Sequence, residues 1–383
     1  MKICSFFLLL LFANSSYAQD VGSAKKWVDT LSSAGFWGRG YTKNGMAKAA
    51  SYLAAQIASF DLKPIAGKSF FQSFAYPVNT FPGKMEVSLN GRKLVPGKEF
   101  IVSPDSRSVT ANAALQQQDS THFTNAANRI IVTLADKLTW SVAPEPGSYT
   151  MIQVDKKVLT EVPATIRVSV DSKLVPNFSA SNVCAWVKGT VKPDSVIVIS
   201  AHYDHLGGMG SNTYFPGAND NASGTSLLLG LAKYYAKNPA PYTMAFIAFA
   251  GEEAGLKGSK HYTDNPLFPL KNIHFLVNLD LEGTGDEGIT VVNATEHPEA
   301  FGFLNMLNDE GKFLSKINAR GKAANSDHYW FTEKGVPAFF LYTLGGIRAY
   351  HDIFDRAKTL PLTEYEDLFK LIVKFNSEMM KSR

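Results

Sequence analysis

Residues 196–205 read VIVISAHYDH, an apolar run from Val196 to Ser200 that is followed at once by His202, Asp204 and His205. The run is short and does not alternate with polar residues, which is typical of a strand buried on both faces. Three later runs share this character: Met244–Ala250, Ile273–Leu279 and Ala338–Tyr342. The chain therefore has four candidate strands for the interior of one sheet.

Stretches with helical periodicity separate these runs. They are Ser226–Ala236, Pro298–Leu314 and a final helix from about Thr363 to Lys381, where Thr363 and Glu366 form a candidate capping box. Strands that alternate with helices usually form a parallel sheet covered on both sides. We therefore predict an α/β fold with a mostly parallel central sheet flanked by helices on both faces.

The N-terminal half has a different texture. Residues 42–60 predict a helix, and Phe70–Tyr76 predicts a strand that ends at Pro77. Residues 79–176 are polar and β-leaning, with a hairpin turn signal at Asn90-Gly91. We interpret residues 79–176 as a small β-rich insert or lid with little chemistry, placed between residues 19–78 and 177–383 of the main domain.

The first eighteen residues resemble a secretory signal. Lys2 precedes the apolar run Ile3–Phe12, and small residues lead to a cleavage site after Ala18. About ten apolar residues are too few to span a bilayer, which needs roughly twenty. We therefore predict cleavage of residues 1–18 and a periplasmic or secreted protein with no membrane anchor. Cleavage also removes Cys4 and leaves Cys184 alone, so no intramolecular disulfide is expected.

The composition is that of an ordinary globular protein: 383 residues, 45% hydrophobic and 19% charged, with a formal net charge of +4. The basic residues are scattered along the chain and form no dense stripe. This distribution argues against nucleic acid or an anionic membrane surface as a partner.

Polar residues collect directly after the four apolar runs. A glycine-bounded loop, residues 216–224, adds one more acid just before the first helix of this region. The candidates are, in chain order, His202, Asp220, Glu252, Glu253, Asp280 and His351. Because sites in open parallel sheets form at the carboxyl ends of the strands, we expect these imidazoles and carboxylates to converge in one cleft.

Imidazole and carboxylate ligands without a thiolate suit zinc. Two zinc ions need one bridging carboxylate and separate ligands for each ion. Five candidates meet that need: His202, Asp220, Glu253, Asp280 and His351. Glu252 is then free to act as a general base. Taken singly, each residue has a structural explanation, such as a core histidine or a turn acid. Their joint placement favours metal, because clustered buried acids are costly without a cation.

At this point several segments resemble the motifs of the co-catalytic dizinc aminopeptidases of metallopeptidase family twenty-eight. The segments are Ser200–Gly207, Gly217–Gly224, Gly251–Ser259, Asn278–Asp280 and Tyr350-His351, and Ser326–Phe331 and Gly335–Ala338 also fit. The resemblance runs from about Val183 to the C-terminus in the family's order. It is weaker before that point, and residues 79–176 do not convincingly resemble the protease-associated domain of many secreted relatives. Asn219 stands where many relatives have Asp.

The resemblance implies a role for each residue. His202 and Asp280 would bind one zinc ion, Glu253 and His351 the other, and Asp220 would bridge the two. The remaining implied roles fall to three residues that are not ligands. Asp204 would orient His202 by a hydrogen bond, Glu252 would act as the general base, and Tyr350 would stabilise the oxyanion.

The resemblance thus implies a secreted, zinc-dependent aminopeptidase that hydrolyses N-terminal residues from peptides, on a phosphorylase/hydrolase-like α/β fold. Two alternatives stay open at this stage. One is a carboxypeptidase of the same family, for which Arg348 is the nearest basic candidate, and the other is a glutaminyl-peptide cyclotransferase-like transferase with one zinc ion. A metal-free interaction domain is disfavoured, because no ligand position and no base is missing. Side-chain preference and oligomeric state stay open.

Overall fold

The computed structural model of the chain describes residues 21–381. The predicted signal segment, residues 1–18, lies outside the described residues together with Cys4, so its cleavage stays a prediction. Within residues 21–381, no helix combines the length and the apolar character needed to cross a membrane.

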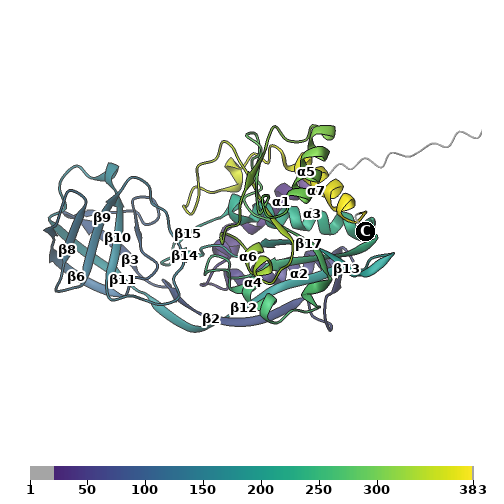
Figure 1. Cartoon of the computed structure of the whole chain (residues 1–383). Coiled ribbons are helices and arrows are strands. Elements are labelled where there is room, and N and C mark those ends of the chain that lie inside the picture. Colours follow the sequence, from purple (N-terminus) through teal and green to yellow (C-terminus); the bar gives the residue numbers. More distant parts are fainter. Residues whose placement is uncertain (1–20, 382–383) are drawn as a thin grey trace, which may run out of the picture.

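A nine-stranded sheet forms the centre of the molecule (Figure 1). Its strands, in spatial order, are β1 (Lys63–Pro64), β12 (Lys173–Val187), β16 (Tyr242–Phe249), β13 (Lys192–His202), β17 (Ile273–Leu279), β20 (Ala338–Thr343), β18 (Ile289–Val292) and β19 (Ile317–Arg320), with β2 (Phe71–Thr80) paired to β12. The four strands predicted from the apolar runs, β16, β13, β17 and β20, are adjacent and parallel. The outer pairings of β12 and of β18 with β20 are antiparallel, so the sheet as a whole is mixed.

Both faces of the central strands are covered, as the lack of alternation predicts. All eight residues of β16 are buried, and alternate residues belong to different cores. Phe246 packs in the core on one face, and Ile247 packs in the core on the other. Polar side chains can therefore be accommodated only where these strands end.

Within residues 21–381, seven α-helices cover the sheet. They are α1 (Val21–Leu31), α2 (Gly45–Ser59), α3 (Gly224–Lys237), α4 (Lys257–Asp264), α5 (Pro298–Gly311), α6 (His328–Glu333) and α7 (Tyr365–Met379). Helices α1, α2, α3, α5 and α7 contribute to the larger core on one face, whereas Tyr262 of α4 and Phe331 of α6 pack on the other. Helices thus lie on both faces, as predicted.

Two local predictions are wrong. The capping box at Thr363 does not form, because α7 begins at Tyr365 with Glu364 as its N-cap and without a side-chain cap. Pro77 does not end its strand, since β2 continues to Thr80. The proline lies beside a register shift in an edge strand, between the pairs that Tyr76 and Val78 make with β12, where a missing N–H is tolerated.

Residues 81–172, hereafter the insert, form two smaller sheets to one side of the main body (Figure 1). One sheet contains β5 (Phe100–Val102), β10 (Thr150–Asp155), β9 (Ile130–Ala135), β8 (His122–Asn125) and β7 (Gln116–Gln117); the other contains β4 (Arg92–Lys93), β3 (Met85–Leu89), β11 (Thr165–Val170) and β6 (Val109–Ala114). The predicted Asn90-Gly91 turn joins β3 to β4, with both residues at positive φ. The long strands β2 and β12 connect the insert to the body (Figure 1).

Candidate metal centre

The carboxyl ends of the central strands deliver the predicted residues to one place. His202 is the last residue of β13, Asp280 follows β17, and Glu252 and Glu253 follow β16 by a short turn. Asp220 lies in the turn of helix η3 (Ala218–Ser223) that leads into α3. The loop after β20 adds a further ligand candidate, His351, whose backbone has a positive φ.

Asp220 lies between two imidazoles. Its Oδ1 is 3.4 Å from Nε2 of His202, and its Oδ2 is 3.0 Å from Nε2 of His351. The side chain is buried. The two oxygens of this carboxylate therefore face different nitrogen donors, which is the arrangement that a bridging ligand requires.

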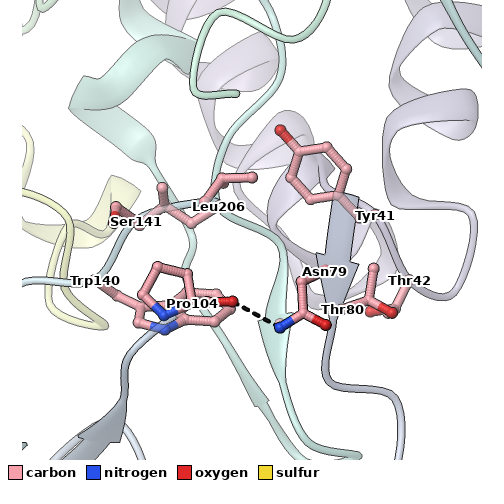
Figure 2. Close-up of a pocket in the computed structure, with 10 residues that line it drawn as sticks. Tyr41, Thr42, Asn79, Thr80, Pro104, Trp140, Ser141 and Leu206 are labelled. Atoms are coloured by element: carbon pink, nitrogen blue, oxygen red, sulfur yellow. Dashed lines mark hydrogen bonds between the residues drawn. The ribbon is translucent and has the colours of Figure 1, made fainter. Parts of the chain in front are cut away.

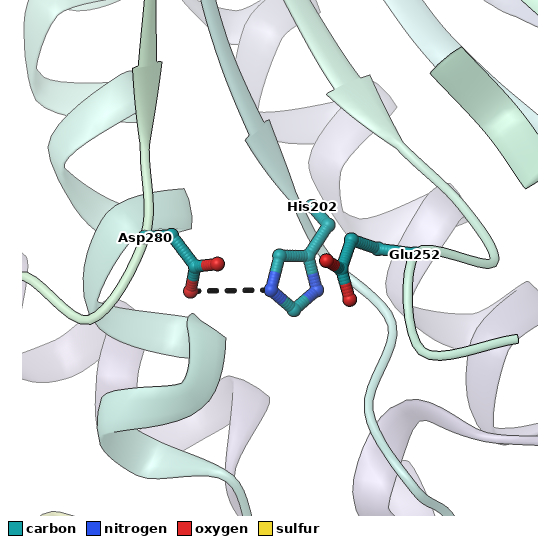
Figure 3. A group of neighbouring side chains, drawn as sticks. All are labelled: His202, Glu252 and Asp280. Atoms are coloured by element: carbon teal, nitrogen blue, oxygen red, sulfur yellow. Dashed lines mark hydrogen bonds and ion pairs between the residues drawn. The ribbon is translucent and has the colours of Figure 1, made fainter. Parts of the chain in front are cut away.

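One half of the centre consists of His202, Glu252 and Asp280 (Figure 3). Nε2 of His202 lies 3.2 Å from Oδ1 of Asp280, and Glu252 approaches the same ring from the side opposite Asp280 (Figure 3). One ligand atom from each of the three residues lies within 4.8 Å of the others. The three side chains thus converge as the sequence predicts.

Glu253 is the centre of the other half, where each of its oxygens faces a different ring. Oε2 lies 3.2 Å from Nε2 of His351, and Oε1 accepts a 2.7 Å hydrogen bond from Nδ1 of His205. His205 had no predicted role, although it comes three residues after His202 at the end of the same strand. His205 and Glu253 also group with Asp220 at metal-ligand separations.

Asp204 contacts the turn that carries both glutamates, and its predicted role in orienting His202 stays a prediction. Its carboxylate accepts hydrogen bonds from the backbone N–H groups of Glu252 (3.1 Å) and Glu253 (3.3 Å). The ring of His202 contacts the backbone oxygen of Asp204 at 3.2 Å, and its Nδ1 is 3.8 Å from the carboxylate. The carboxylate of Asp204 therefore holds the turn that carries both glutamates, whereas the ring of His202 contacts the backbone oxygen of Asp204 rather than its carboxylate.

The buried acids exceed the buried cations around this centre, and the pKa values reflect it. Burial raises the pKa of Glu252 well above its usual range, and Glu253 and Asp280 reinforce that shift against the opposing effect of His202. Burial alone would lower the pKa of His351, but Glu253 and Asp220 raise it to about 9. The pKa of His202 is raised in the same way, chiefly by Asp280 and Glu252. The site therefore favours additional positive charge.

These residues fit zinc. The donors are imidazole nitrogens and carboxylate oxygens, without thiolate, and each of the two groups presents its atoms within 4.8 Å. The carboxylates of Asp220 and Asp280 are buried close together, an arrangement whose cost a bound cation would offset.

The comparisons with known proteins agree with this geometry. A model of peptidase family M28 matches residues 182–376, which is half of the chain. The chain belongs to peptidase family M28. Aminopeptidase YwaD of Bacillus subtilis is 32% identical over 168 residues, a match that covers 43% of this chain and 36% of that protein. A probable leucine aminopeptidase of Trichophyton verrucosum is 27% identical over 197 residues, covering 49% of this chain and 55% of that protein.

Solved structures share the fold over nearly the whole chain. A zinc aminopeptidase from Bacillus subtilis, BSAP, superimposes with a TM-score of 0.69 at 19% identity and covers 94% of this chain and 95% of its own. A peptidase M28 precursor from Shewanella amazonensis gives a TM-score of 0.65 at 14% identity, covering 94% of this chain and 97% of its own. The shared fold therefore extends beyond the residues that the family model matches.

The M28 centre faces a cavity of about 530 Å³, a size suited to a small ligand or a peptide end. The cavity floor holds the metal-ligand candidates together with Glu252. Tyr350, 44% exposed, lines the cavity and stacks on the ring of His351 with the centroids 4.0 Å apart. Leu281, Phe340, Tyr342 and Arg320 also line it.

Arg39 is a support that the sequence analysis missed, and it lies outside the span of the family model. Its side chain is fully buried, and its guanidinium donates five hydrogen bonds of 2.7–3.1 Å to backbone carbonyl oxygens. The accepting residues are Leu31, Tyr203, Pro216, Gly217 and Asp220. Burial lowers the pKa of Arg39 to about 10 against the opposing effect of nearby acids, chiefly Asp220 and Asp355. Arg39 thus anchors the backbone of the loop that carries Asp220.

Two more supports come from within the M28 span. Asp355 accepts hydrogen bonds from the backbone N–H groups of Asn219 and Asp220, at 2.8 and 3.0 Å. Burial raises the pKa of Asp355 to about 6, although these hydrogen bonds lower it. The hydroxyl of Ser326 donates to Oδ2 of Asp280 at 3.2 Å, which gives the Ser326–Phe331 motif a structural role.

Proposed function

We propose that this protein is a zinc-dependent aminopeptidase that removes N-terminal residues from peptides with the help of two zinc ions. The single observation that carries the proposal is Asp220, whose two oxygens each face a different imidazole. Family membership and the relatives named as aminopeptidases support it. The chain spans only 36% and 55% of the lengths of these two curated relatives.

In this proposal His202 and Asp280 hold one zinc ion, His351 and Glu253 hold the other, and Asp220 is shared. The ligand distances to the shared carboxylate and the surplus of buried acids support this division. Zinc, when bound, supplies Lewis acidity that makes a water molecule easier to deprotonate and a carbonyl easier to attack.

Glu252 then moves the proton. One of its oxygens lies within 4.8 Å of ligand atoms of His202 and Asp280, and in this proposal it stays outside both ligand sets; burial raises the pKa of its carboxyl group. As a positioned general base, Glu252 takes the proton of the attacking water and passes it to the leaving amine. The hydrogen bonds from the Glu252 and Glu253 backbone to Asp204 keep the base in place. Tyr350 lines the same cavity, where its hydroxyl can donate to the oxyanion.

The cavity is lined by the carboxylates of Asp220, Glu252, Glu253 and Asp280, but three of these are proposed zinc ligands. Bound metal would offset their charge, so these acids do not by themselves distinguish an amino end from a carboxyl end. One observation favours the second candidate, a carboxypeptidase for acidic residues. Arg320 lines the cavity, with Nη1 3.4 Å from the hydroxyl of Tyr342, and could pair with a substrate carboxylate.

A matched set of substrates tests the proposal. We expect amino-acid p-nitroanilides and peptides with a free N-terminus to be cleaved, and the N-acetylated forms of the same peptides to resist. A chelator should abolish cleavage, and added zinc should restore it. Cleavage of acetylated peptides as fast as free ones would refute the aminopeptidase, and release of C-terminal glutamate would support the second candidate.

A further inference from the structure

The insert touches the metal centre at one point, the backbone of Trp140. The N–H of Trp140 donates to the carbonyl oxygen of His351 at 2.9 Å. In return, Nδ1 of the His351 ring lies 3.0 Å from the carbonyl oxygen of Trp140. The two residues are 211 positions apart in the chain, so this pair of hydrogen bonds joins the insert to the loop that carries a predicted zinc ligand.

The contact decides which nitrogen of His351 faces the centre. A carbonyl oxygen accepts hydrogen bonds, so Nδ1 carries the proton and Nε2 is left as the donor atom toward metal. Nε2 is the atom that lies 3.0 Å from Asp220 and 3.2 Å from Glu253. Hydrogen bonds of this kind fix the tautomer and ring orientation of histidine ligands.

Trp140 is held firmly where insert and body meet. Its side chain is buried, its indole N–H donates to the carbonyl oxygen of Val102 within the insert, and its ring stacks on Phe215 of the body at 4.6 Å. Trp140 lines a small pocket at this boundary together with Leu206 from the body (Figure 2). The position of the Trp140 carbonyl therefore depends on how the insert docks on the body.

Lys137 makes a second contact to the same loop, residues 344–356. Its Nζ donates to the carbonyl oxygen of Arg348 at 3.0 Å and lies 3.9 Å from the carboxylate of Asp352. Asp352 accepts a hydrogen bond from the backbone of Phe354 at 2.8 Å and so shapes the turn just after His351. The insert thus holds the loop on both sides of the histidine.

We propose that the insert is a working part of the metal centre: through the carbonyl of Trp140, supported by Lys137, it orients His351 and so sets the affinity for one of the two zinc ions. This inference rests on the proposed function. The insert acts from behind the ligand, because all described residues that line the cavity lie outside residues 81–172. Trp140 is accordingly a positioning residue and touches no substrate.

Zinc titration of the full-length apoprotein by calorimetry tests this inference, with four variants. Trp140→Ala removes the anchor of the carbonyl, and Trp140→Phe retains a ring that can stack on Phe215. Lys137→Ala removes only the exposed contact. Lys156→Ala is the matched control, because Lys156 is an equally exposed lysine of the insert whose ion pair with Asp136 lies within the insert.

We expect Trp140→Ala to lower the affinity for one zinc ion by about 10- to 100-fold and to leave the affinity for the other nearly unchanged. Loss of the hydrogen bond that supports a histidine ligand has an effect of that size. Trp140→Phe should keep most of the affinity that Trp140→Ala loses. Lys137→Ala should lower the affinity for the same ion by a smaller factor, and Lys156→Ala should bind both ions as the unaltered protein does. Equal weakening of both ions, or no change in either, would overturn the inference.

Two outcomes separate this inference from the function on which it rests. If the unaltered protein binds fewer than two zinc ions, the dizinc proposal itself is wrong. If it binds two and the variants do not alter either affinity, only the role of the insert is wrong. Should Trp140→Ala fail to fold, Lys137→Ala decides the matter, because that exposed side chain belongs to no core, and unchanged affinity in it counts against the inference.

Discussion

The central sheet and the sheets of the insert handle polar side chains in opposite ways. Every residue of β16 in the body is buried, whereas β6 of the insert alternates between half-buried and exposed residues along its whole length. A strand covered on both faces can place polar groups only at its ends, and a strand with one open face distributes them along the surface. The body therefore concentrates acids and histidines that solvent does not fully surround at the carboxyl ends of these strands, and the insert disperses its ionisable groups into solvent.

The same difference separates two kinds of charge. In the insert, ion pairs such as Lys93 with Glu86 are well exposed and contribute little to stability. In the body, Glu252 and Asp280 are enclosed, and burial raises the pKa of each carboxylate. Charges of the second kind are costly unless a cation or a reaction uses them, so substitutions in the two regions should differ greatly in effect.

The largest effect is expected at Glu252. Glu252→Gln keeps the volume of this half-buried side chain but removes the proton acceptor, so kcat should fall by about 10²- to 10⁴-fold, the usual range for general acid–base catalysis. Zinc content should stay at the level of the unaltered protein, because neither ligand set includes this residue. Steady-state kinetics on an amino-acid p-nitroanilide together with metal analysis measures both quantities. Near-normal turnover would remove Glu252 from the role of base.

A smaller but still large effect is expected at Arg39, beneath the same centre. Arg39→Met leaves buried carbonyl oxygens without donors, and each unpaired group costs about 1–3 kcal/mol. We expect the free energy of unfolding of the apoprotein to fall by about 3–5 kcal/mol, the range seen when buried charged partners are removed. Urea denaturation measures this change.

Arg39→Lys separates charge from geometry. Lysine keeps the positive charge near Asp220 and Asp355 but offers three donors in place of five. If five-fold carbonyl binding is what matters, the lysine variant should lose most of the same stability. A lysine variant as stable as the unaltered protein would show that Arg39 serves only to balance the buried acids.

The sequence predicted the body well because continuous apolar runs are themselves a signature of doubly covered strands. The ends of those runs then predicted where His202, Asp280 and the two glutamates would meet. The supports were less accessible to sequence reasoning. Arg39 and Trp140 act on backbone carbonyl oxygens, which every residue possesses, at separations of 164 and 211 positions. No side-chain pattern marks such a partner before the fold is known.

Local rules failed where tertiary packing opposed them. The capping box at Thr363 does not form, and α7 begins instead at Tyr365. Tyr365 is buried, and its hydroxyl lies 3.0 Å from that of Ser226 in α3. The expectation of little chemistry in the insert came from its polar, β-leaning pattern and stays a prediction, which the proposed role of Trp140 would revise. The hydrogen bonds between Trp140 and His351 arise from docking of two parts of the chain, which composition does not report.

The smallest effect is expected on the open face of the insert. Arg167 is an exposed residue of β11, and Val168, the next residue, is buried in the core of the insert. Arg167→Ala should change the free energy of unfolding by less than about 0.5 kcal/mol and leave kcat/KM unchanged, as for most surface substitutions. Val168→Ala is the matched control, since loss of two buried methyl groups should cost about 2 kcal/mol. If Arg167→Ala instead lowered kcat/KM, the exposed face of the insert would have to take part in substrate binding. The contrast between a body that carries the reactive groups and an insert face without a catalytic role would then be wrong.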